Sequence, residues 1–171
     1  MNIRILNESD AILYQELRLR ALKINPEAFG STYEREASFT PEAVKDRIKP
    51  SEDKFVLGAF EEGKRLIGMA VFVRERSLKT AHKGNVYGMF IAPEARSKGV
   101  GKLLLIELIR MAKKCPGLEQ INLTVVSINE TAKKLYKSVG FQVYGLERNA
   151  LKFNGQYFDE DLMVLNIDCF S

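Results

Sequence analysis

The chain has 171 residues, of which 46% are hydrophobic and 28% are charged, and its formal net charge is +4 at pH 7. These values are ordinary for a soluble globular protein and allow one domain with a substantial core. No apolar run approaches the roughly 20 residues that cross a membrane, and two cysteines with one histidine give neither a disulfide framework nor a multi-histidine metal site. We expect one domain over residues 1–171, in the cytoplasm, with no metal and no membrane partner.

The first third of the chain predicts one strand and two helices. Residues 3–6 alternate weakly in hydrophobicity, as a short strand does, and residues 11–24 carry apolar side chains at helical spacing. Thr40 and Pro41 suit the cap and first turn of a second helix, which extends to about residue 49. The segment between the helices, residues 27–39, is irregular. It could cover a substrate or only pack on the core, and composition leaves both open.

The middle of the chain predicts three strands. Residues 55–60 and 66–75 are rich in β-forming residues, and Glu61-Glu62-Gly63-Lys64 between them predicts a hairpin turn. A polar loop over residues 76–84 leads to a third strand over residues 86–91. Gly88 interrupts this strand, which indicates a bulge or a backbone that lies close to a ligand.

A long apolar helix predicts how the third strand connects to the next one. The helix covers about residues 100–114, and the continuous apolar run at residues 121–126 reads as a strand covered on both faces. Strand, helix and strand form a right-handed crossover, so the strands at residues 86–91 and 121–126 should be parallel.

The end of the chain predicts a helix and a hairpin. Asn129 and Gly140 suit the two ends of a helix over residues 130–139. Asn154-Gly155 is a strong type I′ turn signal, and it predicts a hairpin made of residues 141–167.

The turn between the third strand and the long helix suits a phosphate group. Gly99 and Gly101 let the backbone aim successive N–H groups at one point, and the helix start adds unpaired amides and the positive end of the helix dipole. Arg96, Lys98 and Lys102 add positive charges. The turn therefore predicts a pyrophosphate site, while a glycine-rich turn on a basic surface would contain the same residues.

Two well-known phosphate motifs do not fit this turn. A Walker loop needs glycine where Arg96 stands and Ser or Thr where Leu103 stands, and a dinucleotide fingerprint needs glycine where Leu104 stands. The pattern that remains, Arg-x-x-Gly-x-Gly at the start of a helix, resembles the acetyl-CoA motif of the GCN5-related N-acetyltransferase (GNAT) superfamily. Residues 129–141 resemble its second signature, with Asn, Ala, Leu-Tyr and Gly-Phe in order.

The resemblance implies a fold and a reaction. The fold would be an α+β (mixed α/β) domain with a seven-stranded, mostly antiparallel sheet, splayed between strands four and five, with helices on both faces. The reaction would be transfer of an acetyl group from acetyl-CoA to a primary amine, which attacks the thioester directly. By the same resemblance, acetyl-CoA would bind Met89, Phe90, Ile91, Arg96, Ser97, Lys98, Gly99, Val100, Gly101, Lys102, Asn129 and Lys133.

The resemblance also makes Tyr136 the general acid that protonates the leaving sulfur. Helical spacing alone allows another reading, in which Tyr136 belongs to an apolar stripe with Ala132, Leu135 and Val139 and only packs in the core. The general base is not predicted, because Asn85 stands where some relatives have a glutamate. An amine of low pKa or a chain of water molecules would need no dedicated base.

The acceptor is predicted only as a small-molecule amine or a protein N-terminus. Candidate acceptor-binding residues come from three segments: Phe29, Tyr33, Glu34, Asn85, Tyr87, Asp159 and Glu160. The carboxylates near residue 160 could attract a cationic amine or lie on a solvated edge strand. The candidate substitutes for the missing base are Glu34, Glu36, Tyr87, Asp159 and Glu160.

Two other functions remain open from sequence. A non-catalytic acyl-CoA sensor could use the same fold, although the tyrosine at position 136 favours an enzyme. A basic nucleic-acid-binding module fits the charge, but no aromatic stacking platform accompanies the basic turn. We therefore expect no nucleic-acid partner, and either a monomer or a homodimer.

Overall fold

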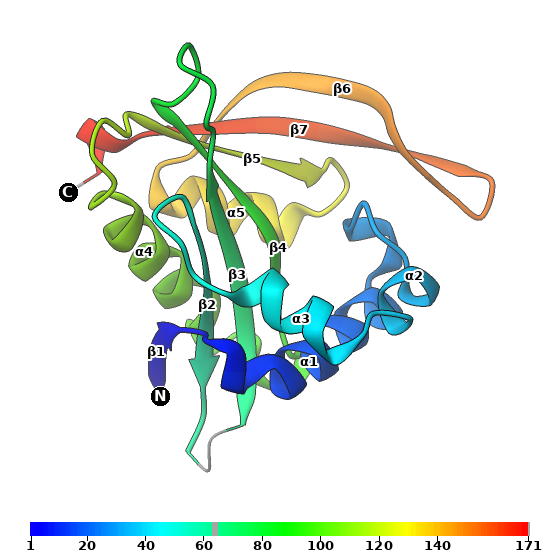
Figure 1. Ribbon diagram of the computed structural model, residues 1–171. Helices are drawn as coiled ribbons and strands as arrows, with labels where there is room; N and C mark the ends of the chain where they lie inside the picture. The colour runs from blue at the N-terminus through cyan, green and yellow to red at the C-terminus, as the bar shows by residue number, and fades with distance from the viewer. Residues whose placement is uncertain (63–64, 171) are drawn as a thin grey trace.

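The structure, a computed structural model, describes residues 1–62 and 65–170 and contains one seven-stranded sheet (Figure 1). The strands are β1 (Asn2–Ile5), β2 (Lys54–Phe60), β3 (Leu66–Arg74), β4 (Lys83–Ile91), β5 (Gln120–Val126), β6 (Gln142–Phe153) and β7 (Gln156–Asn166). The α-helices are α1 (Ala11–Ile24), α2 (Tyr33–Ala37), α3 (Pro41–Ile48), α4 (Val100–Ala112) and α5 (Glu130–Val139). Short 3-10 helices are η1 (Glu8–Asp10), η2 (Pro26–Ala28), η3 (Pro93–Ala95) and η4 (Ile167–Cys169).

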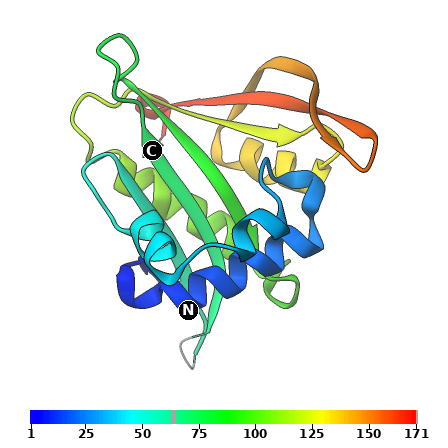
Figure 2. The same ribbon diagram turned by 45° about the vertical axis from the view of Figure 1, so that its right-hand side comes forward.

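The sheet opens between its central strand, β4, and the neighbouring β5. The strand order is β1-β2-β3-β4-β5-β7-β6, and every neighbouring pair is antiparallel except β4 and β5. The parallel pairing joins only residues 83–85 to residues 120–122. Beyond it the two strands diverge, which Figures 1 and 2 show as a wedge between β4 and β5. The predicted parallel crossover and splayed sheet are confirmed.

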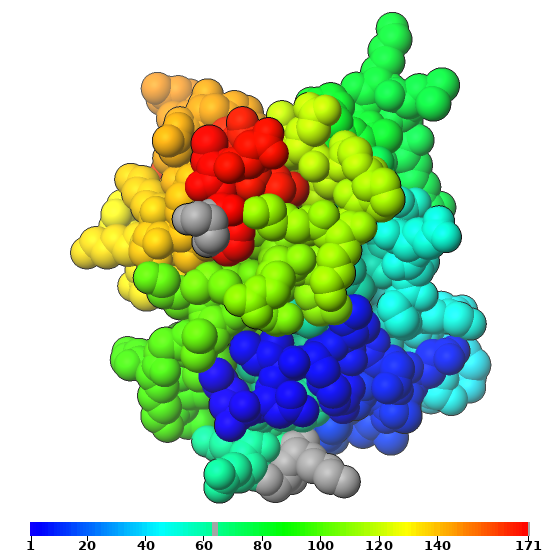
Figure 3. All heavy atoms as spheres, turned by 90° about the vertical axis from the view of Figure 1, so that its left-hand side faces the viewer, coloured from blue at the N-terminus to red at the C-terminus, as the bar shows by residue number. Residues whose placement is uncertain are grey.

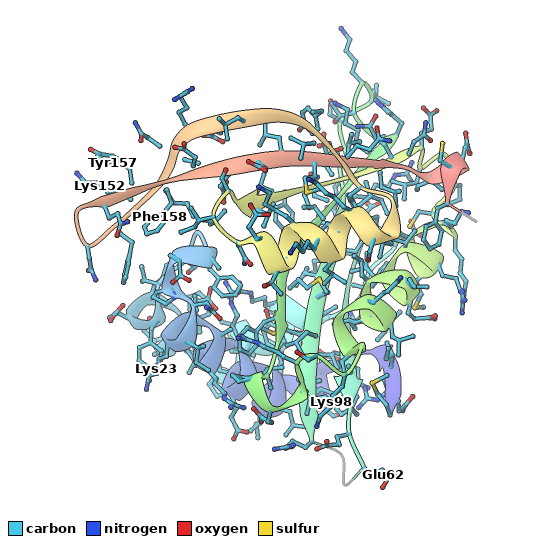
Figure 4. The ribbon with its side chains drawn as sticks, turned by 180° about the vertical axis from the view of Figure 1, so that it is seen from behind. Lys23, Glu62, Lys98, Lys152, Tyr157 and Phe158 are labelled. Atoms are coloured by element: carbon cyan, nitrogen blue, oxygen red, sulfur yellow. The ribbon has the colours of Figure 1, made fainter. Side chains whose placement is uncertain are left out.

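Helices cover both faces of the sheet, as predicted. Helices α1, α2 and α3 lie in front of the sheet in Figure 1, and α4 and α5 lie behind it, as Figure 4 shows from the opposite side. The apolar stripe of α4 packs into the core, where Leu104, Leu105 and Leu108 are fully buried. Within the described part of the chain, no helix is both long and apolar enough to cross a membrane.

Strand β4 begins earlier than the sequence pattern predicted. The prediction placed residues 76–84 in a loop, but β4 starts at Lys83. Gly84 is the reason, because a β-carbon there would overlap the Phe72 ring, so the glycine is buried in a close strand contact rather than in a turn. The segment read as irregular, residues 27–39, also contains the short helix α2. The hairpin turn predicted at residues 61–64 lies partly outside the described residues, and β2 and β3 pair as predicted.

The last hairpin has the predicted turn geometry. Asn154 and Gly155 have φ values of 48° and 76°, which a type I′ turn requires. The hairpin of β6 and β7 forms one edge of the sheet and extends to the right above α2 in Figure 1, and β6 contacts η2. Figure 2 shows the same hairpin on the right. At its other end the chain returns to α4, where Lys113 donates from Nζ to the carbonyl oxygen of Phe170 at 2.6 Å. Figure 3 shows this C-terminal segment in red against the yellow-green end of α4.

Candidate active site

The turn before α4 presents a row of free backbone amides. Ser97 and Gly99 have φ values of 61° and 78°, and Gly99 is the N-terminal cap of α4 without a capping side chain. The N–H groups of residues 97–102 donate to no protein acceptor in the described chain, and the first helical bond runs from Leu103 N to Gly99 O at 3.1 Å. Successive amides in such a turn, at the positive end of a helix, bind anions.

The three basic residues of this turn have different positions. Lys98 and Lys102 are exposed, and Figure 4 shows Lys98 on the turn itself. The Arg96 guanidinium is directed back: its Nε donates to the carbonyl of Ile91 at 3.0 Å and its Nη2 to Asn25 at 3.1 Å. It also lies over the Phe90 ring. Arg96 therefore holds the turn against the ends of β4 and α1, and Lys98 and Lys102 add exposed charges that are not tied back in this way.

Gly101 allows α4 to lie close to its neighbours. A β-carbon at this position would stand 3.2 Å from Leu135 of α5, 3.5 Å from Ile91 and 3.7 Å from Met89. At Gly99, by contrast, a β-carbon would have no described atom within 4 Å. The two glycines thus serve different needs, close helix packing at Gly101 and a left-handed backbone at Gly99.

Strand β4 carries a bulge beside the open wedge. Met69 is opposite Phe90 and Val71 is opposite Tyr87, so Gly88 and the residue after it share one partner, and Gly88 has a φ of 56°. The N–H of Ala92 bonds to Ile67 of β3. Alternate residues of a strand direct their backbone N–H groups to opposite sides. The N–H of Phe90 is therefore directed to β3, while those of Met89 and Ile91 are directed into the wedge, where β4 has no strand partner.

Helix α5 places Tyr136 behind the wedge in an apolar environment. Tyr136 is 9% exposed, its ring packs edge-on against Phe141, and burial raises the pKa of Tyr136 to about 12. Its hydroxyl makes no hydrogen bond to any described residue. Asn129 caps α5 by accepting from Ala132 N at 3.1 Å. The Lys133 ammonium is bound to Asp161, Glu130 and the carbonyl of Ser127, so its charge is already neutralised.

A cavity of about 320 Å³ opens on the front of the sheet at the bulge. Helices α1 and α3 and strands β2, β3 and β4 form its walls, which are Tyr14, Arg18, Arg47, Lys54, Val56, Val71, Tyr87 and Gly88. Only Tyr87 among the predicted acceptor residues lines it. Phe29 lies next to it, with the Arg18 guanidinium 4.8 Å from its ring centre.

The other predicted acceptor residues lie outside this cavity. The Asp159 carboxylate accepts from the backbone N–H of Asn149 at 2.8 Å, and Asn85 donates to Glu75 at 3.4 Å. Glu160 lies opposite Glu147 in the hairpin, and burial raises its pKa. Tyr33 packs under Lys23, and Glu34 is exposed. The structure therefore does not bring the predicted carboxylates together with Tyr87.

Sequence reasoning missed Arg18, which is the most buried charged group at the cavity. Arg18 is 5% exposed, on the core-facing side of α1 with Tyr14, Leu17 and Ala21. An arginine inside an apolar helical stripe was the available signal. Its guanidinium makes two hydrogen bonds to Glu36, both 2.9 Å long.

Glu36 is fully buried between two arginines and cannot serve as the base. Burial raises its pKa, but the hydrogen bonds and charges of Arg18 and Arg47 outweigh this effect, and the pKa is about 2. A carboxylate so acidic does not take a proton from an amine at neutral pH. Glu36 instead fixes both guanidinium groups at the cavity wall.

Replacing Glu36 by glutamine should destabilise the fold by about 3–5 kcal/mol, since it leaves a buried guanidinium without its counter-ion. Because the folded pKa lies below the ordinary value of 4.5, the stabilisation is complete above pH 4.5 and is lost as the pH falls toward 2. Urea unfolding of both proteins over this pH range checks the prediction. Glu34→Gln, a neighbouring exposed change, should stay within about 0.5 kcal/mol. Equal stability of Glu36→Gln and the unmodified protein would contradict it.

The mixed sheet that opens between β4 and β5, with an anion-binding turn after β4 and a cavity at the β4 bulge, has the fold of solved GNAT-family acetyltransferases. Residues 3–162 match the family described as the acetyltransferase (GNAT) domain, and the chain belongs to this family. The structure of a GNAT-family acetyltransferase from Streptococcus pneumoniae has a TM-score of 0.84 and 23% identity, with 96% of this chain and 98% of that chain covered.

Two further relatives extend the comparison. YokL, an uncharacterized N-acetyltransferase derived from the SPbeta prophage of Bacillus subtilis (strain 168), is 22% identical over 161 residues, which is 93% of this chain and 85% of YokL. The structure of yncA from Salmonella typhimurium, determined with its cofactor acetyl-CoA, has a TM-score of 0.77 and 25% identity, with 100% of this chain and 96% of that chain covered.

Proposed function

We propose that this protein is an acetyl-CoA-dependent N-acetyltransferase that acetylates a primary amine by direct attack on the thioester. The observation that carries the proposal is the wedge between β4 and β5. A turn with a row of free amides follows β4, and a cavity lined by Gly88 lies at the β4 bulge. The acetyl-CoA bound to the Salmonella yncA structure supports the choice of acyl donor.

Acetyl-CoA would supply an acetyl group activated as a thioester, and the chain offers groups that match its parts. The free amides of residues 97–102, with Lys98 and Lys102, would hold the pyrophosphate. The backbone groups of Met89 and Ile91 would bond the pantetheine arm as an added strand does. The amide at the bulge, between Gly88 and Met89, would polarise the thioester oxygen.

The proton balance assigns one role to Tyr136. The amine nitrogen forms a bond to the acetyl carbon, the carbon–sulfur bond breaks, and the amine loses a proton while the sulfur gains one. With a pKa of about 12, the Tyr136 phenol is protonated at neutral pH and can donate to the leaving sulfur. The phenol would then regain a proton from solvent. Asn129, besides capping α5, would contact the pantetheine arm.

Release of free CoA in the presence of a panel of primary amines tests this function. We expect acceptor-dependent thiol release with at least one amine, and an acetylated product of matching amount. Tight acetyl-CoA binding with no acceptor-dependent release from any amine would contradict the proposal and indicate a sensor.

A further inference from the structure

One nitrogen of the Arg18 guanidinium, beside the bulge, has no hydrogen-bond acceptor in the described chain. The Arg18 side chain is 7% exposed, and its Nε and Nη2 atoms donate to Glu36. The remaining nitrogen, Nη1, donates to no acceptor in residues 1–62 or 65–170. It lies 3.4 Å from where a β-carbon on Gly88 would stand, at the cavity wall. Because Nη1 is not among the fully buried atoms that lack a partner, it keeps accessible surface at the cavity wall and can donate to a ligand there.

The charge of the cavity indicates the sign of that ligand. Its walls carry three cationic side chains, Arg18, Arg47 and Lys54. Glu36, which binds both arginines, offsets one charge, and Lys54 donates to the backbone carbonyl of Asp46. The balance is positive, which favours an anionic group in the cavity. The same charges disfavour the protonated form of a nearby amine, which reduces the need for a base at Asn85.

We propose that the acceptor is a small α-amino acid whose α-carboxylate binds Arg18 Nη1 while its amino group faces the bulge. This inference rests on the proposed acetyltransferase function and names its substrate class. In an α-amino acid one carbon separates the amine from the carboxylate. A carboxylate held beside Gly88 therefore places the amine close to the thioester oxygen site at the Gly88–Met89 amide. Glycine at position 88 leaves that space open.

The size of the cavity agrees with a small acceptor. Its volume of about 320 Å³ is near the lower end of the range for small-molecule sites. A protein N-terminus carries a neutral peptide carbonyl in place of the carboxylate, so it would leave the positive balance unmet. The amino acid supplies an acceptor for Arg18 Nη1 and a negative charge that offsets the positive balance.

Kinetics with paired acceptors test the assignment. Each L-amino acid is compared with its carboxamide and with its decarboxylated amine, with CoA release and product mass as readouts. We expect kcat/KM to favour the best amino acid over its two analogues by about 10- to 100-fold, the range for a hydrogen bond to a charged group. The double variant Arg18→Met/Glu36→Met removes both buried charges together, which preserves packing better than removing one. In this variant the preference should fall below about 3-fold, with the KM for acetyl-CoA unchanged.

Two further variants separate recognition from folding. Arg18→Lys keeps a cation beside Glu36 but has no second nitrogen to reach the bulge, so it should also lose the preference. Arg4→Met/Asp10→Met removes a second doubly hydrogen-bonded pair outside the cavity, in which both hydrogen bonds are 2.7 Å long and the arginine is more exposed. This control should lose stability but keep the preference for the carboxylate.

The assignment is overturned if the unmodified protein acetylates carboxamides, decarboxylated amines or peptide N-termini as efficiently as amino acids. It is also overturned if folded Arg18→Lys retains the full preference. Either result leaves the acetyltransferase proposal intact, whereas an absence of transfer to every amine overturns both proposals.

Discussion

Replacement of Gly99 by valine should weaken acetyl-CoA binding by on the order of 100-fold or more, which is the loss of one or two hydrogen bonds to a charged group. Gly99 has a φ of 78°, a region that β-branched residues avoid, so valine would force the turn into another conformation. The free amides of residues 97–102 would then no longer face one ligand. Titration calorimetry with acetyl-CoA measures the effect.

The hairpin tip provides a matched control for this substitution. Gly155 has a φ of 76°, and a β-carbon added at Gly155 or at Gly99 would have no described atom within 4 Å. Gly155→Val therefore carries a similar backbone strain, but the change lies in the β6–β7 turn, away from the proposed pyrophosphate site. It should bind acetyl-CoA normally. Unchanged affinity in a folded Gly99→Val protein would remove the pyrophosphate from this turn.

Tyr136→Phe should lower turnover by roughly 100-fold or more, the usual contribution of a general acid, while the Kd for acetyl-CoA barely changes. The fold should be little affected, because the hydroxyl makes no hydrogen bond to a described residue and the ring packing against Phe141 remains. Single-turnover kinetics, in which chemistry is isolated from product release, give the relevant rate.

The pKa of Tyr136 adds a pH test. Its ordinary value is 10.0 and burial raises it to about 12, so the protonated phenol stabilises the fold up to pH 10 and this contribution is lost as the pH rises toward 12. At any pH up to about 10 the phenol stays protonated, so deprotonation of Tyr136 should not slow the reaction in that range. Tyr144→Phe, at an exposed site of β6, should have normal turnover. Normal turnover of Tyr136→Phe would assign Tyr136 to the core alone.

Local signals predicted most of the fold because they depend on neighbouring residues. A type I′ turn needs two residues with positive φ, and Asn154-Gly155 supplies both, so the pair alone predicts the turn. In the same way Asn129 and Gly140 predict the two ends of α5. The crossover through α4 follows from handedness rules that hold for nearly all such units. The glycine turn was predicted for the same reason, since its conformation depends on Ser97 and Gly99 themselves.

The acceptor side was not predicted because it depends on contacts between distant segments. Arg18 and Glu36 are 18 residues apart and lie on different helices, and no local pattern pairs them. The sequence placed Glu36 among candidate bases, whereas two arginines make it a structural anion. Asp159 looked available to a cationic amine, but the backbone of Asn149 in the facing strand already binds it.

The most direct test of direct acetyl transfer repeats the amine reaction with acetyl-CoA that carries a deuterated acetyl group. Mass spectrometry then follows the label in the amine and on the intact protein, including Cys115 and Cys169, the two free thiols. We expect all transferred label in the amine, none on the protein, and one equivalent of CoA released per product. Label that accumulates on the protein, or CoA binding with no labelled amine, would contradict direct attack in the wedge between β4 and β5.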